Sequence, residues 1–312
     1  MTVGETGEFG LISNIIARLG TGSTVLLGPG DDAAVVAAPD GRVVASTDVL
    51  VEGRHFRRDW SSAVDVGHRA AAANLADIAA MGAAPTALLV ALCTPPDLPV
   101  RWAEQLADGL GEECALVGAA VVGGDISASP TLTIAVTALG TLGESAPVTR
   151  SGARPGDVIA VAGRLGWAAA GYTVLSRGFR SPKALVDAHR RPLVPYRSGP
   201  GAARLGATSM IDVSDGLLAD LGHLAKASNT SMEVRRDALE VPPVMSDAAA
   251  ALGADPYQWI LAGGDDHALV ATFPPSVKLP QEWRLIGRVR DGAGVTVDGK
   301  PYEGPTGWDH FR

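Results

Sequence analysis

Lysine and cysteine are scarce in this chain of 312 residues, and each shortage excludes a class of protein. Only 4 of the 26 basic residues are lysines, and the formal net charge of −8 argues against a general binder of nucleic acid or of anionic membranes. The 2 cysteines, Cys93 and Cys114, allow neither a disulfide framework nor a cysteine-rich metal site. Both lie in apolar stretches, so we expect them to be reduced and buried.

The sequence also lacks a long uninterrupted apolar run. Its longest uncharged stretch, 78–96, contains Gly82 and Pro85, which predicts a helix end, a turn and a buried strand in place of a membrane span. The N-terminal residues show no basic region followed by an apolar core, so no secretory signal is indicated. We therefore expect a cytoplasmic protein that binds neither nucleic acid nor a membrane. A hydrophobic content of 46% with 19% charged residues excludes a disordered chain.

Helical and strand-like patterns are mixed along the chain without regular alternation, which favours two α+β domains over one doubly wound sheet. A polar segment rich in Gly and Pro, 143–156, indicates the boundary, so we expect domains at 1–145 and 146–312. Apolar spacing predicts helices at 8–19, 62–81, 99–117, 166–177, 182–190 and 216–227. Strands are expected at 24–27, 33–37, 42–46, 87–93, 119–122, 131–139, 158–162, 209–213, 267–273 and 283–289.

Aspartate is what the chain has in excess, with 23 Asp against 11 Glu. Many of these residues stand where an apolar run ends, namely Asp31, Asp32, Asp48, Asp77, Asp125, Asp212, Asp215, Asp265 and Asp266. Carboxylates that project from sheet edges into one cleft repel each other unless a cation neutralises them. Hard divalent cations such as Mg²⁺ prefer carboxylate oxygens and are usually shared with substrate phosphates. The positions therefore predict a carboxylate-lined site for metal and polyphosphate.

Each position also has an ordinary structural interpretation. The segment GPGDD is typical of a turn, Asp215 before GLLADL is a candidate helix N-cap, and Asp77 fits a solvated helix face. The common nucleotide and hydrolase motifs are missing, because there is no G-x-x-x-x-G-K-[ST] loop, no G-x-G-x-x-G fingerprint after a strand and no G-x-S-x-G. A nucleotide enzyme with this sequence would have to use metal and Asp where others use a P-loop.

Eight segments together carry a family resemblance. They occur in the order GPGDDAAVV, STDVLVEGRHF, NLADIAAMGA, VVGGDIS, TRSGARPGD, IDVSDGLLADLGH, LAGGDDHAL and GWDHF. From about Gly7 to Phe311 the chain resembles the thiamine-monophosphate kinase family of the aminoimidazole-ribonucleotide synthetase superfamily. The resemblance implies a two-domain α+β ATP-binding fold whose N-terminal mixed sheet dimerises, and a homodimer as the working form. It implies that ATP and thiamine monophosphate react to give thiamine diphosphate and ADP.

The resemblance also assigns roles to residues. Those matching its magnesium ligands or their support are Asp32, Ser46, Thr47, Asp48, Asp77, Asp125, Asp212 and Asp215. ATP contacts are implied for Gly124, Asp125, Arg150 and Ser214. Substrate contacts are implied for His55, Asp265 and Trp308. We expect direct in-line phosphoryl transfer assisted by several Mg²⁺ ions, with Asp48, Asp212 and Arg150 as the catalytic residues and no general base.

Several residues and the function itself have alternative interpretations. The family often has GGEDYEL where this chain has GGDDHAL, so the carboxylate of Asp265 is one methylene shorter than expected. Arg150 fits a surface ion pair, His55 a solvated loop and Trp308 a plug that packs the C-terminal tail. The competing functions are a related ATP-dependent synthetase, a non-catalytic binding protein for nucleotide or thiamine phosphate, and a divalent-metal phosphatase.

Overall fold

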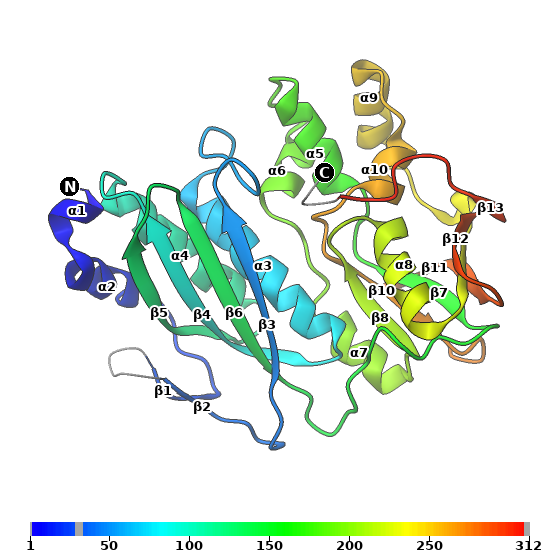
Figure 1. The fold of residues 1–312 in the computed structure, drawn as a ribbon, viewed down its shortest axis with the longest axis horizontal. Coiled ribbons are helices and arrows are strands. Elements are labelled where there is room, and N and C mark those ends of the chain that lie inside the picture. The colour runs from blue at the N-terminus through cyan, green and yellow to red at the C-terminus, as the bar shows by residue number, and fades with distance from the viewer. Residues whose placement is uncertain (1, 29–33, 309–312) are drawn as a thin grey trace. The chain divides into compact units, whose positions relative to one another are not determined.

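A computed structural model describes residues 2–28 and 34–308. The chain divides into two compact units (Figure 1), which are described separately. The N-terminal unit comprises Met1–Ile78 and Ala83–Glu144, and the C-terminal unit comprises Ala79–Gly82 and Ser145–Arg312. The units are mixed α+β, as predicted.

The N-terminal unit is built on a four-stranded sheet of order β3-β6-β4-β5, with β4 and β5 parallel and the other pairs antiparallel. A short antiparallel pair, β1-β2, lies outside that sheet. The helices of the N-terminal unit are α1 (Val3–Thr6), α2 (Glu8–Ile16), α3 (Ala63–Ala80) and α4 (Val100–Ala115). Its strands are β1 (Val25–Leu27), β2 (Val35–Val36), β3 (Val44–Val51), β4 (Ala84–Thr94), β5 (Ala120–Ala128) and β6 (Thr133–Thr141).

Helices α3 and α4 cover one face of this sheet (Figure 1) and lie very close to each other. A Cβ on Gly67 would come within 2.3 Å of the Leu106 carbonyl oxygen, and one on Gly109 within 2.1 Å of the Val64 carbonyl oxygen. Only glycine permits this approach. The buried His68 of α3 then contacts Glu113 of α4 through Nδ1 at 2.7 Å. A second contact joins Nε2 of His68 to Glu112 at 2.8 Å, so small residues and the polar contacts of His68 hold the layer that backs the sheet.

The C-terminal unit contains a seven-stranded sheet of order β13-β12-β9-β11-β7-β10-β8, antiparallel except for the β9-β12 pair. Its strands are β7 (Val158–Ala162), β8 (Ser209–Val213), β9 (Ser231–Val234), β10 (Ala268–Phe273), β11 (Trp283–Arg290), β12 (Gly294–Val297) and β13 (Lys300–Pro301). Its helices are α5 (Trp167–Ser176), α6 (Lys183–Arg190), α7 (Ser198–Leu205), α8 (Leu217–Ser228), α9 (Pro243–Leu252) and α10 (Pro256–Ala262), with a 3₁₀ turn at Arg236–Ala238. Strands β7, β8 and β10 are buried along their whole length, and apolar residues predominate in them.

Several elements differ from the sequence prediction. Strand β3 runs through Asp48 to Val51, beyond the predicted end at residue 46, and β5 continues past Val122 to Ala128. Polar residues in these strands obscured the apolar pattern, because the free edges and outer face of the sheet tolerate them. Helices α7, α9 and α10 and strands β9, β12 and β13 were not predicted. Cys114 is buried as expected, whereas Cys93 is only half-buried, since it lies on the outer face of β4; both cysteines are free.

In the described part of the chain, no helix combines the length and the apolar character that crossing a bilayer requires.

Candidate active site

One group of predicted site residues lies where β3 faces α3 in the N-terminal unit. The Ser46 hydroxyl donates to Oδ2 of Asp77 at 2.6 Å. The backbone N–H of Asp48 donates to Oδ1 of Asn74 at 3.0 Å, and the amide of Asn74 in turn donates to the Ala70 carbonyl at 2.9 Å. Asn74 and Asp77 share a helix face because they are three residues apart. The structure therefore brings Ser46, Asp48 and Asp77 together at a half-buried polar seam.

Thr47 and Asp125 belong to the other face of this sheet. The register aligns Asp48 with Val136, Val90 and Gly124 in one row, whereas Asp125 falls in the next row. Successive side chains of a strand point to opposite faces, so Asp125 does not join the Ser46, Asp48 and Asp77 group within one copy of the chain. The Thr47 hydroxyl is already used, since it donates to the Val136 carbonyl at 2.9 Å.

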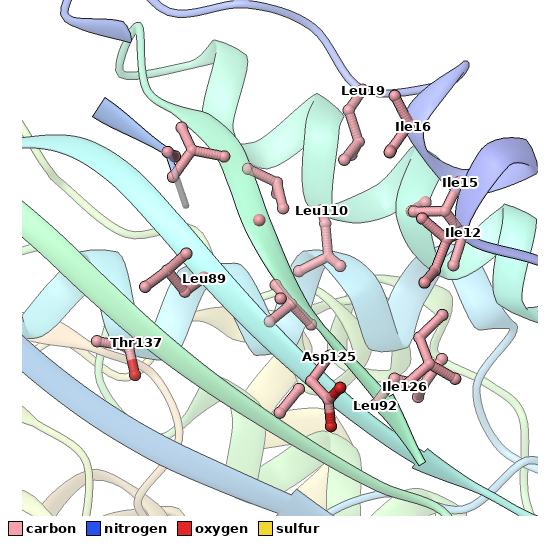
Figure 2. Close-up of a pocket in the computed structure, with 18 of the residues that line it drawn as sticks. Ile12, Ile15, Ile16, Leu19, Leu89, Leu92, Leu110, Asp125, Ile126 and Thr137 are labelled. Atoms are coloured by element: carbon pink, nitrogen blue, oxygen red, sulfur yellow. The ribbon is translucent and has the colours of Figure 1, made fainter. Parts of the chain in front are cut away.

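Asp125 lies in a large apolar groove of the N-terminal unit (Figure 2), with a volume of about 790 Å³. Isoleucines of α2 line one side, and residues of β4, β5 and β6 such as Leu89 and Thr137 line another. Asp125 is the one charged residue among the lining residues that the structure describes. An exposed carboxylate at the rim of an apolar groove is available to a ligand or to a partner surface.

Gly124 has a packing role that accounts for its presence without a ligand. A Cβ at this position would stand 1.8 Å from the carbonyl oxygen of Val90 on the neighbouring strand. Strand β5 therefore approaches β4 as closely as it does only because residue 124 has no side chain. The predicted contact of Gly124 with nucleotide stays a prediction.

His55 is held in a defined orientation by the turn after β3. Its Nδ1 accepts a hydrogen bond from the backbone N–H of Val51 at 2.9 Å. In the neutral imidazole the proton is consequently on Nε2. The predicted metal ligand Asp32, with its neighbour Asp31, lies outside the described residues.

In the C-terminal unit, Asp212 lies near the end of β8 and pairs in register with Leu269 of β10. Its carboxylate Oδ2 is 3.0 Å from Nδ1 of His267, and both side chains are buried. The next residues form a tight loop around Asp220, whose Oδ2 accepts the backbone N–H groups of Ser214, Asp215 and Gly216 at 3.1 Å each. The carboxylate of Asp220 thus holds the loop that carries Ser214 and Asp215.

The pKa of Asp220 is strongly raised. Burial, followed by repulsion from the carboxylate of Asp212, raises the pKa of Asp220 to about 7, while the N–H donors of the loop act in the opposite direction. One potential ligand atom each from Asp215, Asp220 and His223 lie within 4.8 Å of one another. The unit therefore concentrates anionic oxygens here, as a cation site requires.

The segment Gly263–His267 adjoins this loop. Asp265 donates its N–H to the Ser214 carbonyl at 2.9 Å and has a φ of +66°, and His267 donates its N–H to the Val213 carbonyl at 3.0 Å. Between them the Asp266 carboxylate caps α5, accepting the N–H groups of Gly166 at 2.5 Å and Ala168 at 2.8 Å. Burial raises the pKa of Asp266 to about 7 even though these two donors lower it. Asp266 thus has a structural role, whereas its neighbours Asp265 and His267 adjoin the residues of the candidate site.

The last predicted residues are more exposed. Trp308 donates its backbone N–H to the Asp215 carbonyl at 2.9 Å, and 60% of the residue is accessible. Trp308 is therefore attached to the Asp215 loop through its backbone, while much of the residue is accessible. Arg150 is exposed, and its carbonyl accepts the hydroxyl of Ser228 at 3.1 Å.

The donors in both units suit a hard divalent cation. They are carboxylate, hydroxyl and carbonyl oxygens, which are the ligands of Mg²⁺, and the carboxylates are already oriented by N–H and O–H groups. Sequence reasoning missed the orienting residues Asp220 and His267, and it counted Asp266 among the carboxylates of the site, whereas the structure uses Asp266 to cap α5. The spacing of Asn74 to Asp77 was the one signal that pointed to such a partner, because it places both on one helix face.

Comparison with known proteins defines the class. The model of the AIR synthase related protein N-terminal domain matches residues 30–142, and that of the C-terminal domain matches residues 154–300. The fold is thus that of an AIR synthase related protein. A thiamine-monophosphate kinase of Mycobacterium tuberculosis (strain CDC 1551 / Oshkosh) is 49% identical over 99% of this chain and 93% of its own length. The chain therefore belongs to the thiamine-monophosphate kinase family.

Solved structures agree with this assignment. A structure described as AaThiL complexed with AMPPCP and TMP has a TM-score of 0.82 and 35% identity, and the match covers 100% of this chain and 99% of that one. The thiamine-monophosphate kinase from Stenotrophomonas maltophilia K279a has a TM-score of 0.80 and 32% identity, covering 94% of this chain and 95% of that one. The similarity therefore extends over both units.

Proposed function

We propose that this chain transfers the γ-phosphoryl group of ATP to thiamine monophosphate, which gives thiamine diphosphate and ADP. The observation that carries the proposal is the 49% identity to a thiamine-monophosphate kinase over 99% of the chain. The related structure with AMPPCP and TMP supports the same two substrates here. The use of ATP supports the cytoplasm as the place of action.

The chemistry is a direct displacement. A phosphate oxygen of thiamine monophosphate attacks the γ-phosphorus of ATP, the bond from that phosphorus to the bridging oxygen breaks, and ADP leaves with the electron pair. The acceptor is already an anion, so no side chain has to act as a strong base. The barrier lies mainly in bringing two polyanions together, and catalysis then consists of positioning and charge neutralisation.

We propose that several Mg²⁺ ions take part, and the oxygen-rich donor sets described above support this. The residues proposed to hold them are Asp32, Ser46, Thr47, Asp48, Asp77, Asp125, Asp212 and Asp215. Bound Mg²⁺ would neutralise charge on the phosphate oxygens. Asp48 and Asp212 are proposed as catalytic because each lies in one of the two polar groups, where Asn74 holds the backbone of Asp48 and His267 contacts the carboxylate of Asp212.

Other residues are proposed to bind the two substrates. For ATP they are Gly124, Asp125, Arg150 and Ser214, and for thiamine monophosphate they are His55, Asp265 and Trp308. The exposed guanidinium of Arg150 suits a bidentate contact with phosphate. The accessible indole of Trp308 suits stacking on a cationic thiazolium ring. The Nε2 proton of His55 suits a phosphate oxygen.

We further propose a homodimer in which a second copy covers the outer face of the N-terminal sheet. Large apolar side chains lie open on that face, with Val49 48% and Leu89 38% exposed. The apolar groove beside Asp125 continues the same surface. Burying such a patch removes apolar area from water, which is the main driving force for stable association.

The decisive experiment is a product assay. Purified protein with ATP, Mg²⁺ and thiamine monophosphate should form thiamine diphosphate and ADP in equal amounts, measured by mass spectrometry. Folded protein that forms no diphosphate would overturn the proposal. ADP release only with another acceptor would indicate a synthetase, phosphate release without acceptor a phosphatase, and tight binding without turnover a sensor.

A further inference from the structure

His267 lies against a proposed metal ligand. Its Nδ1 is 3.0 Å from Oδ2 of Asp212, and only 6% of His267 and 4% of Asp212 is exposed. The contact joins the segment before β10 to the end of β8, where Leu269 pairs with Asp212. His267 stands where the family pattern often has a tyrosine.

The chemistry of His267 and Asp212 determines which of the two donates the hydrogen bond. A carboxylate that binds a cation only accepts hydrogen bonds, so in that state the Nδ1–H of His267 donates a hydrogen bond to Oδ2 of Asp212. That bond restricts rotation of the carboxyl group and directs its remaining lone pairs. A ligand whose orientation is fixed by a hydrogen-bonded neighbour binds metal more tightly than one that must be ordered on binding.

The backbone of this segment is held independently of the imidazole ring. His267 has a φ of +50°, a conformation that persists only where surrounding contacts impose it. Those contacts are the N–H of His267 to the Val213 carbonyl, the N–H of Asp265 to the Ser214 carbonyl, and the cap that Asp266 makes on α5. Removing the ring therefore leaves the backbone of the segment anchored and takes away the contact with Asp212.

We propose that His267 is a positioning residue that orients the Asp212 carboxylate for a divalent cation. The inference rests on the proposed function, because Asp212 is a metal ligand only in that context. It adds a residue that the resemblance does not assign to the site. Its effect should be on cation affinity first and on turnover through that affinity.

The test uses Mn²⁺ as the probe with the ligand-free, full-length protein, followed by the EPR signal of free Mn²⁺. His267→Phe keeps the ring and removes the donor, and we expect Mn²⁺ binding about tenfold weaker or worse. His267→Asn places an amide nitrogen at the position of Nδ1 and should restore affinity to within about threefold of the wild type. The Mg²⁺ concentration for half-maximal rate should shift in the same order.

His189→Phe is the matched control, because His189 is also a buried histidine of the same unit and should leave Mn²⁺ binding unchanged. His267→Ala serves as a second donor-free variant if His267→Phe does not fold, as judged by circular dichroism. Wild-type affinity in a folded donor-free variant, a loss that His267→Asn does not restore, or no Mn²⁺ site in the wild type would each overturn the proposal. The titration needs no turnover, so a failed product assay would sink the proposed function separately.

Discussion

The hydroxyl of Ser46 and the carboxylate of Asp77 are 2.6 Å apart, one on β3 and the other on α3. A strand residue and a helix residue thirty-one positions later thus form one polar pair. The hydrogen bond fixes the orientation of the Asp77 carboxylate. It makes the β3-α3 seam a partly preorganised element of the proposed site.

Asp77→Asn should therefore abolish most activity with little loss of stability. The substitution keeps a hydrogen-bond acceptor for Ser46 and removes one negative charge, so kcat/KM should fall by at least about a hundredfold. Steady-state kinetics over a range of Mg²⁺ concentrations measures the effect, and thermal unfolding checks the fold. Asp59→Asn, at an exposed residue paired with Arg57, is the control and should be nearly silent. Near-normal turnover in Asp77→Asn would remove Asp77 from the metal role.

Gly124→Ala should destabilise the N-terminal unit. The new Cβ would stand 1.8 Å from the Val90 carbonyl oxygen, so β5 must move away from β4. Overpacking against backbone costs about 3 kcal/mol, or roughly 6–12 °C in Tm for a domain of this size. Differential scanning calorimetry measures the loss. Gly20→Ala is the matched control, because a Cβ there meets nothing within 4 Å. Equal Tm values for the two variants would contradict the packing role.

The stability of the protein should fall as pH rises through about 7, in part because of Asp266. Its folded pKa is raised from 3.8 to about 7, so the folded state holds the proton more tightly than the unfolded state between those values. The stabilisation is complete below pH 3.8 and is lost as pH rises through about 7. Asp266→Asn lacks this titration, and its Tm should decline less between pH 5.5 and pH 8 (roughly the upper half of that window). Parallel Tm curves for variant and wild type would contradict the assignment.

Leu89→Asp should convert the proposed dimer to a monomer. Leu89 lines the apolar groove and is 38% exposed, so a carboxylate there would be buried without a partner in the dimer, at a cost of several kcal/mol. Light scattering coupled to size-exclusion chromatography measures the mass. Leu285→Asp is the control, since Leu285 is 54% exposed on β11 of the other unit. A dimer that survives Leu89→Asp would show that this face is not the interface.

The sequence was informative where periodicity is strong and where one pattern decides. Strand 158–162 and strand 209–213 were predicted with the bounds that β7 and β8 have, because each is a short apolar run between polar residues. Helix α7 was missed because its sequence, SGPGAARL, begins with Gly and Pro. Helices α9 and α10 both begin at a proline, which is favourable at a first helical position but resembles a loop signal in the sequence.

The candidate site likewise contains contacts that the sequence suggests and contacts that it does not. Ser46, Asp48 and Asp77 come together because a strand and the following helix are neighbours, which sequence order suggests. The placement of Asp125 on the opposite sheet face depends on strand register, which the sequence did not reveal. His267 contacts a residue 55 positions away through tertiary packing, so no local pattern could identify it as a partner of the site. Asp220 is only four to six residues from the N–H groups it accepts, but its position inside α8 resembles an ordinary helix residue.

The cap that Asp266 places on α5 bears on how this segment can vary. Both GGDDHAL and the family pattern GGEDYEL keep an aspartate at this position, while the residues before and after it differ. The capping residue fixes the course of the backbone, and its two neighbours then become exchangeable without a change of fold. Asp265 and His267 are therefore the positions at which a protein engineer could retune substrate and cation preference, one substitution at a time, on an unchanged support.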